Sequence, residues 1–195
     1  MKKILLASKS PRRREILGLL QIPFTVVTIE GIDESYPETL EPEKVSEYIS
    51  NKKADAFLKR IQEDELIITA DTVVICDGKI LGKPKGREDA IEMLRFLSGK
   101  THKVTTGVTV ATKEKRDSFS SESLVKFAEL TDSEIRYYVD TFHPYDKAGA
   151  YGIQEWIGAV AVAEIQGSFY NVMGLPVHRL YQVLKQFSVF QARHL

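Results

Sequence analysis

The chain has 195 residues, 43% of them hydrophobic, and its 27 Lys and Arg balance 27 Asp and Glu to a formal net charge of zero. This length fits one domain, or one domain with two lobes, and zero net charge excludes the global basic field typical of nucleic-acid binding. The single cysteine, Cys76, excludes an intramolecular disulfide, and no apolar run suits a signal peptide or a membrane span, so we expect a cytoplasmic protein that contacts no membrane.

The first part of the chain alternates strands and helices. Short apolar runs predict strands, and apolar residues at helical spacing predict helices. In chain order we expect a strand over residues 4–7, a helix from Pro11, a strand over 24–27, a helix over 43–61 and a buried strand over 66–69.

The second part adds hairpins. Asp77-Gly78 between apolar runs predicts a tight type I′ turn joining strands 73–76 and 79–81. We then expect a helix over 87–98, strands over 104–110 and within 118–127, a helix from the capping box at residue 131, a strand over 157–165 and a last helix over 176–186. The interleaved pattern predicts a mixed α/β fold.

Arginines crowd the start of the first helix. Ser10 is a good N-cap and Pro11 suits the first helical position, so Arg12, Arg13 and Arg14 fall in the first turn. Cations are disfavoured at this positive end of the helix dipole unless an anion fills the site. The segment therefore predicts an anion pocket for phosphate, with a solvated surface cluster as the alternative.

Charged residues also follow the buried strand. Asp71 comes directly after it, where a carboxylate can bind a hard metal or orient a water, and Lys83 lies beyond the hairpin between Gly82 and Pro84. We expect Asp71 and Lys83 to be neighbours in space because they lie at the two ends of the same predicted hairpin. A turn-forming aspartate and a surface ion pair are the alternatives. Glu34 and Lys53 are further candidates that, taken singly, also suit solvated positions.

Residues 146–154 combine small residues and glycines with polar side chains, so a ligand can approach the backbone closely. Tyr151 and Gln154 suit a nucleobase pocket, and a flexible loop is the alternative. The sequence contains neither the P-loop nor the Rossmann glycine pattern, which excludes the ordinary nucleotide-binding motifs.

Four segments together resemble the Maf family of nucleoside triphosphate pyrophosphatases: residues 7–13, 70–74, 80–84 and 146–154. The resemblance runs from residue 4 to about residue 184. It implies a single Maf-like domain over residues 1–195, with the α/β, mixed-sheet fold shared with inosine triphosphate pyrophosphatases and two lobes around a central substrate groove. It also implies cleavage of a nucleotide between its α- and β-phosphates with a divalent cation, Mg²⁺ or Mn²⁺, and a possible homodimer.

The resemblance also implies residue roles. Asp71 becomes the proton acceptor with Glu34, Lys53 and Lys83 around it, and Asp71 and Glu34 become the metal ligands. The phosphate-binding turn maps onto Ser8, Ser10, Arg12 and Arg13.

Three positions resemble the branch that hydrolyses dTTP and UTP: Arg12, Thr72 and Gln154. A glutamine amide carries a donor beside an acceptor, which complements O4 and N3–H of uracil or thymine. Two alternatives stay open, a nucleotide-binding regulator of cell division or septum formation and an inosine/xanthosine triphosphate pyrophosphatase of the same fold.

Overall fold

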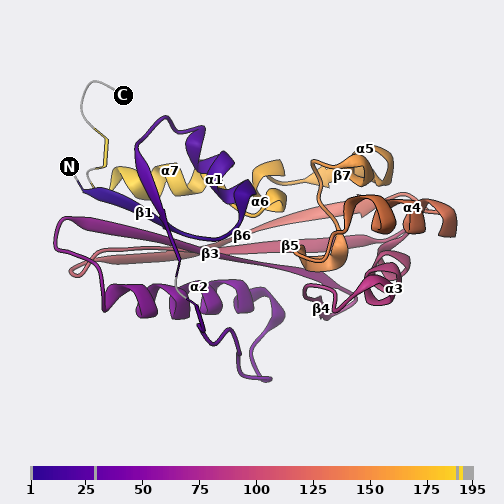
Figure 1. Cartoon of the computed structure of the whole chain (residues 1–195), viewed down its shortest axis with the longest axis horizontal. Coiled ribbons are helices and arrows are strands. Elements are labelled where there is room, and N and C mark those ends of the chain that lie inside the picture. Colours follow the sequence, from indigo (N-terminus) through magenta and orange to yellow (C-terminus); the bar gives the residue numbers. More distant parts are fainter. Residues whose placement is uncertain (1, 29, 188, 191–195) are drawn as a thin grey trace. The chain divides into compact units, whose positions relative to one another are not determined.

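In this computed structural model, which describes residues 2–28, 30–187 and 189–190, seven strands of the described chain form one mixed sheet (Figure 1). They are β1 (Lys3–Ala7), β2 (Phe24–Val27), β3 (Glu65–Cys76), β4 (Lys79–Leu81), β5 (Thr101–Ala111), β6 (Arg116–Phe127) and β7 (Val162–Gln166). The order is β2-β1-β3-β5-β6-β7, and β4 pairs with β3. Since β1 is parallel to β2 and β3 while β4 and β7 are antiparallel to β3 and β6, the predicted mixed α/β class is confirmed.

The helices are α1 (Pro11–Gly18), α2 (Pro42–Leu58), α3 (Arg87–Leu97), α4 (Asp132–Phe142), α5 (Trp156–Ala161), α6 (Phe169–Met173) and α7 (Val177–Lys185), with a 3₁₀ turn, η1, at Ala148–Ala150. Within the described part of the chain, no helix is both long and apolar enough to cross a membrane.

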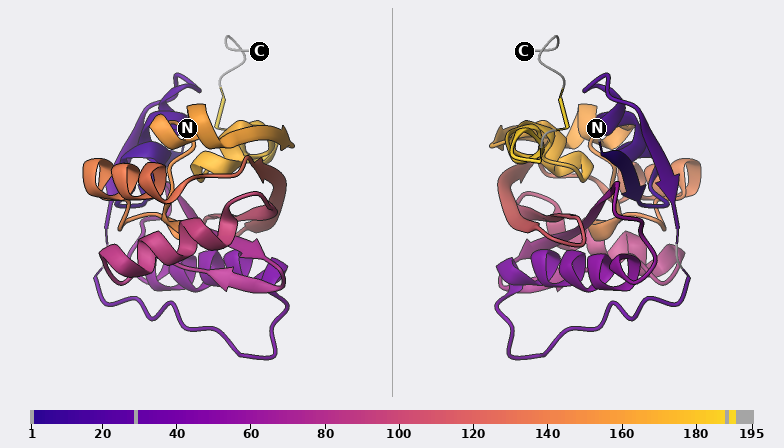
Figure 2. Two further views of the ribbon diagram at one scale, coloured as in Figure 1. Left: turned by 90° about the vertical axis from the view of Figure 1, so that its right-hand side faces the viewer. Right: turned by 90° about the vertical axis from the view of Figure 1, so that its left-hand side faces the viewer.

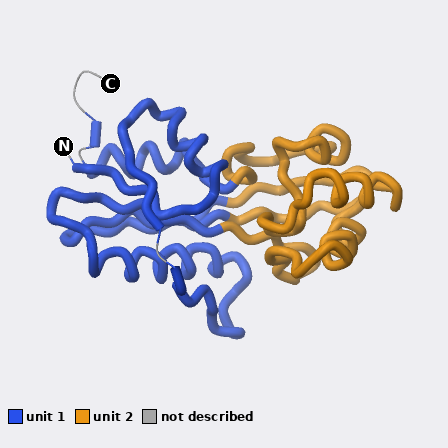
Figure 3. Tube along the Cα trace, viewed as in Figure 1, with its two compact units in different colours: residues 1–71, 106–121, 174–195 blue, residues 72–105, 122–173 orange. Residues whose placement is uncertain are grey.

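The chain is divided into two compact units (Figure 3). Unit 1 comprises residues 1–71, 106–121 and 174–195, and unit 2 comprises residues 72–105 and 122–173. The single domain over residues 1–195 and its central groove stay predictions.

In unit 1, helices cover both faces of the sheet formed by β1 to β3. Figures 1 and 2 show α1 and α7 on one face and α2 on the other. Alternation along β1 explains this arrangement, because Leu6 is fully buried toward one face while Ala7 joins Phe57 of α2 and Ile67 of β3 in a cluster on the other.

In unit 2, α3 and α4 are tied by ion pairs between Arg87 and Asp140 and between Arg95 and Asp132. Helix α4 starts at the predicted capping box. The hairpin of β3 and β4 also forms as predicted, with positive φ at both turn residues, Asp77 and Gly78.

Some predicted elements were wrong. Residues 157–165 were expected to form a strand, but α5 ends at Ala161 and only residues from Val162 onward are extended. A short apolar run does not distinguish a helix from a strand. In α5, a Cβ built on Gly158 would lie 1.7 Å from the carbonyl oxygen of Ile153, so this position accepts only glycine. The strand expected to stop before Asp71 instead continues through it to Cys76, the helix expected to end at residue 61 ends at Leu58, and α6 was not predicted.

Candidate active site

Three charged side chains from separate segments of unit 1 meet. The ammonium of Lys53, on α2, lies 2.8 Å from Oδ1 of Asp71 in β3 and 3.0 Å from Oε1 of Glu34, which precedes α2. The side chains of Lys53 and Asp71 are each 14% exposed, whereas that of Glu34 is 51% exposed. The structure therefore brings together three of the four residues predicted to be catalytic.

Close packing of α2 on the sheet holds Lys53 in this position. A Cβ built on Gly107 of β5 would lie 2.2 Å from the backbone nitrogen of Glu47, so only glycine allows the helix backbone this close. One turn along α2, the Ser50 hydroxyl lies 2.9 Å from Oγ1 of Thr109, and Thr69 donates to the Ser50 carbonyl at 2.7 Å. Because these buried bonds fix the helix at the turn before Lys53, the reach of its side chain toward Asp71 is fixed as well.

Arg13 joins the start of α1 to the same strand. Its Nη1 donates to the carbonyl of Ala70 at 2.9 Å, and its Nε donates to the carbonyl of Gly174 at 2.8 Å. Burial lowers the pKa of Arg13, and the nearby Asp71 carboxylate partly offsets that effect. Since a guanidinium stays protonated in proteins, Arg13 brings a fixed positive charge beside Asp71.

The predicted phosphate-binding turn joins β1 to α1. The backbone N–H of Ser10 donates to Oγ of Ser8 at 3.2 Å, while the Ser10 side chain, although at the N-cap, makes no capping bond to the helix. The first turn of α1 contains no acidic residue, and Arg12 is half-buried. The positive end of this helix is thus not neutralised from within its own first turn. Phosphate binding there stays a prediction.

Asp71 and Glu34 were predicted to bind a divalent cation. Their oxygen atoms are the ligands that Mg²⁺ and Mn²⁺ prefer, and both carboxylates contact the same ammonium, so their oxygens lie near one point. Over the residues that the structure describes, no three or more His, Cys, Asp or Glu side chains gather to hold an ion. A cation held by these two carboxylates would take its other ligands from water and substrate phosphates. Metal binding stays a prediction.

The remaining predicted residues belong to unit 2. Thr72 is half-buried in β3, Lys83 is exposed just after β4, and Gln154 is exposed before α5. The backbone beside Lys83 is fixed, because the N–H of Gly149 donates to the carbonyl of Gly82 at 3.0 Å. The expected proximity of Asp71 and Lys83 stays a prediction.

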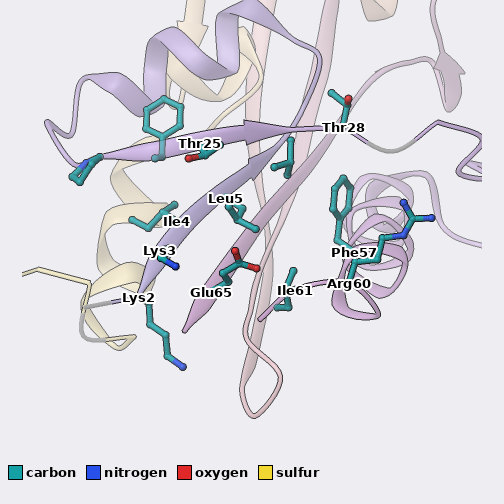
Figure 4. Close-up of a pocket in the computed structure, with 13 residues that line it drawn as sticks. Lys2, Lys3, Ile4, Leu5, Thr25, Thr28, Phe57, Arg60, Ile61 and Glu65 are labelled. Carbon is teal, nitrogen blue, oxygen red and sulfur yellow. The ribbon is translucent and has the colours of Figure 1, made fainter. Parts of the chain in front are cut away.

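A separate pocket of about 630 Å³ lies in unit 1, at the starts of β1 and β3, beside β2 and at the end of α2 (Figure 4). Leu5, Phe57 and Ile61 give it apolar walls, and Lys3 and Arg60 are charged residues of its lining. The predicted site residues are not among those that line it.

A family model described as Maf-like protein matches residues 3–187. The chain belongs to the Maf-like family. A protein of Bacteroides thetaiotaomicron named dTTP/UTP pyrophosphatase is 55% identical over 94% of this chain and 95% of its own length. A protein of the same name from Christiangramia forsetii is 42% identical over 94% of this Maf-like chain and 93% of its own.

Among solved structures, a nucleoside-triphosphatase / dITP/XTP pyrophosphatase from Mycobacterium abscessus aligns with a TM-score of 0.45 at 12% identity, covering 96% of each chain. A HAM1 protein from Coxiella burnetii aligns with the same TM-score and identity, covering 95% of this chain and 100% of its own.

Sequence reasoning missed the residues that hold the candidate site in place. Gly107 carried a usable signal, since a glycine inside an alternating strand often marks close backbone approach. Ser50 and Thr69 carried none, because small polar residues occur on many helices and strands.

Proposed function

We propose that this protein hydrolyses dTTP and UTP to the nucleoside monophosphate and pyrophosphate, by attack of water on the α-phosphorus. The observation that carries the proposal is the contact of the Lys53 ammonium with both Asp71 and Glu34 in a Maf-like chain. The name shared by relatives up to 55% identical supports the choice of substrates.

Each charged group of unit 1 has a task in this proposal. Asp71 accepts a proton from the attacking water, and Lys53 holds the Asp71 carboxylate in one orientation. Arg13 and the backbone N–H groups at the start of α1 bind phosphate oxygens and neutralise their charge. Ser8, Ser10 and Arg12 complete that turn.

Asp71 and Glu34 would hold Mg²⁺ or Mn²⁺. When bound, the cation supplies further charge neutralisation on the phosphate oxygens. Lys83, from unit 2, adds a positive charge for the pyrophosphate leaving group. Thr72 and Gln154 serve substrate recognition, with the Gln154 amide donating to O4 and accepting from N3–H of the pyrimidine.

The proposal also covers the partner, the cellular location and the oligomeric state of the enzyme. Zero net charge supports a small nucleotide rather than nucleic acid as the partner. The single cysteine, buried in β3, supports a reducing, cytoplasmic location. A homodimer is proposed from the resemblance to the family, and light scattering coupled to gel filtration measures it.

A nucleotide panel tests the activity. Pyrophosphate release is measured with Mg²⁺ for dTTP, UTP, CTP, 7-methyl-GTP and ITP, and dTTP and UTP should give the highest kcat/KM. Preference for ITP would instead identify an inosine triphosphate pyrophosphatase, and nucleotide binding without turnover would identify a regulator. Asp71→Asn should remove turnover while the protein stays folded, and substantial remaining activity would contradict the role of Asp71.

A further inference from the structure

A buried hydroxyl holds the segment that carries Gln154. Tyr138, fully buried on α4, donates its O–H to Oε2 of Glu155, and its oxygen accepts the backbone N–H of Gly152 at 3.0 Å. Burial and the Glu155 carboxylate raise the pKa of Tyr138 far above its usual value, so the hydroxyl keeps the proton that it donates.

The contacts of Tyr138 with Glu155 and Gly152 hold the two ends of one turn. The N–H of Glu155 donates to the carbonyl of Gly152 at 3.0 Å, so Gly152 and Glu155 are the first and last residues of a four-residue turn. Gln154 is its third residue and is exposed. One hydroxyl of α4 therefore contacts the first and last residues of the turn that presents Gln154.

The far side of Glu155 is held as well. Its Oε1 lies 3.1 Å from the ammonium of Lys147, whose side chain is 9% exposed and which also contacts Asp146 at 2.8 Å. This contact joins the start of the segment 146–155 to its end. The Glu155 carboxylate is thus shared between α4 and the segment.

The Glu155 carboxylate fills the space beside Gly152. A Cβ built there would lie 2.8 Å from Cδ of Glu155 and 2.9 Å from its Oε2. The carboxylate packs directly over the backbone of residue 152, which leaves the turn little freedom to shift beneath it.

We propose that Tyr138 and Glu155 are positioning residues for pyrimidine recognition: they hold the turn in the conformation in which Gln154 meets the base. This inference rests on the proposed function, in which Gln154 contacts the base. Without the two bonds, the turn must be ordered each time a nucleotide binds, and this entropy cost weakens binding. Substrate and transition state are affected alike, so KM rises while kcat is retained.

Two neighbouring tyrosines provide a matched pair of variants. Tyr138→Phe removes the buried hydroxyl and keeps the ring. Tyr137→Phe makes the same change on the next residue, whose side chain is 51% exposed and packs edge-on against Trp156. We expect Tyr138→Phe to raise KM for dTTP and UTP about tenfold, with kcat within about twofold, and to reduce the preference for both over CTP. Tyr137→Phe should match the wild type.

Glu155→Gln gives a second test. Its amide oxygen still accepts from Tyr138, while the favourable charge opposite Lys147 is lost, so its KM should fall between those of the wild type and Tyr138→Phe. If Tyr138→Phe lowers the melting temperature but leaves KM and base preference unchanged, the tyrosine is only structural and the inference is wrong. Equal KM changes in Tyr137→Phe and Tyr138→Phe also overturn it.

Hydrogen exchange separates this inference from the proposed function, because it needs no turnover. The backbone N–H of Gly152 should exchange faster in Tyr138→Phe than in Tyr137→Phe. Equal protection would show that the Tyr138 hydroxyl does not hold the turn. Wild-type protein that releases no pyrophosphate from dTTP, or Gln154→Ala that keeps base preference, would instead refute the proposed function or the role of Gln154.

Discussion

Replacing His102 by glutamine should reduce the loss of stability on acidification. His102 is 2% exposed, its Nε2 lies 2.8 Å from the hydroxyl of Tyr151, and within the described chain its Nδ1 is buried without a hydrogen-bond partner. Burial lowers the pKa of this imidazole from 6.5 to about 4. The unfolded chain therefore takes up a proton at a pH where the native imidazole stays neutral.

The sign and size of the effect follow from this shift. Because the native pKa is depressed, the contribution of His102 is complete above the unfolded pKa of 6.5 and is lost as the pH falls toward 4. The shift corresponds to about 3 kcal/mol over the whole window, and to about 2 kcal/mol between pH 7 and pH 5. Between pH 7 and pH 5, His102 alone should therefore lower the free energy of unfolding of the wild type by about 2 kcal/mol.

Urea unfolding at pH 7 and at pH 5 measures this change in the free energy of unfolding. His102→Gln keeps a polar partner for Tyr151 but cannot titrate, so it should start less stable at pH 7 and then lose about 2 kcal/mol less than the wild type by pH 5. His178→Gln removes an exposed imidazole from α7 and should lose as much as the wild type. Equal losses in the wild type and His102→Gln would show that burial does not lower the pKa of His102 in the native protein.

The remaining predictions concern the packing around the candidate site. Lys53→Met should reduce kcat/KM for dTTP at least about 100-fold by removing the charge between two carboxylates, whereas Lys59→Met, which removes an exposed lysine at the end of the same helix, should stay near the wild type. Gly107→Ala should lower the free energy of unfolding by about 3 kcal/mol or more in denaturant titrations, because its Cβ meets the backbone of α2. Gly18→Ala, with open space around its Cβ, is the control and should change stability by under about 1 kcal/mol. Unchanged stability in Gly107→Ala would contradict the close packing.

Local sequence signals predicted the elements that depend on local chemistry. Asp77-Gly78 placed a hairpin because both turn residues need positive φ, and the capping box at Thr131 fixed the start of α4 through contacts within one turn. The strand expected over residues 157–165 was wrong because a short apolar run is compatible with either a helix or a strand, and its first part forms α5, which ends at Ala161.

The contact of Lys53 with Asp71 and Glu34 could not be predicted from local sequence signals. Taken singly, Lys53 and Glu34 suited solvated positions, and nothing in their spacing places them against one strand. Their contact depends on the register of α2 on the sheet, which Gly107, Ser50 and their partners determine. The motifs drew attention to the residues through a resemblance, but only the packing explains why they meet.

The contacts that hold α2 also link the stability of unit 1 to the geometry of the candidate site. Lys53 lies within one turn of Ser50, and Ser50 is bonded to both Thr69 and Thr109. Any shift of α2 along the sheet therefore moves the ammonium relative to Asp71, whose own strand carries Thr69. Packing variants at this interface should consequently lower kcat before they unfold the protein, because catalysis depends on distances of a few tenths of an ångström whereas the buried apolar contacts tolerate such shifts. A stability measurement alone would miss that coupling.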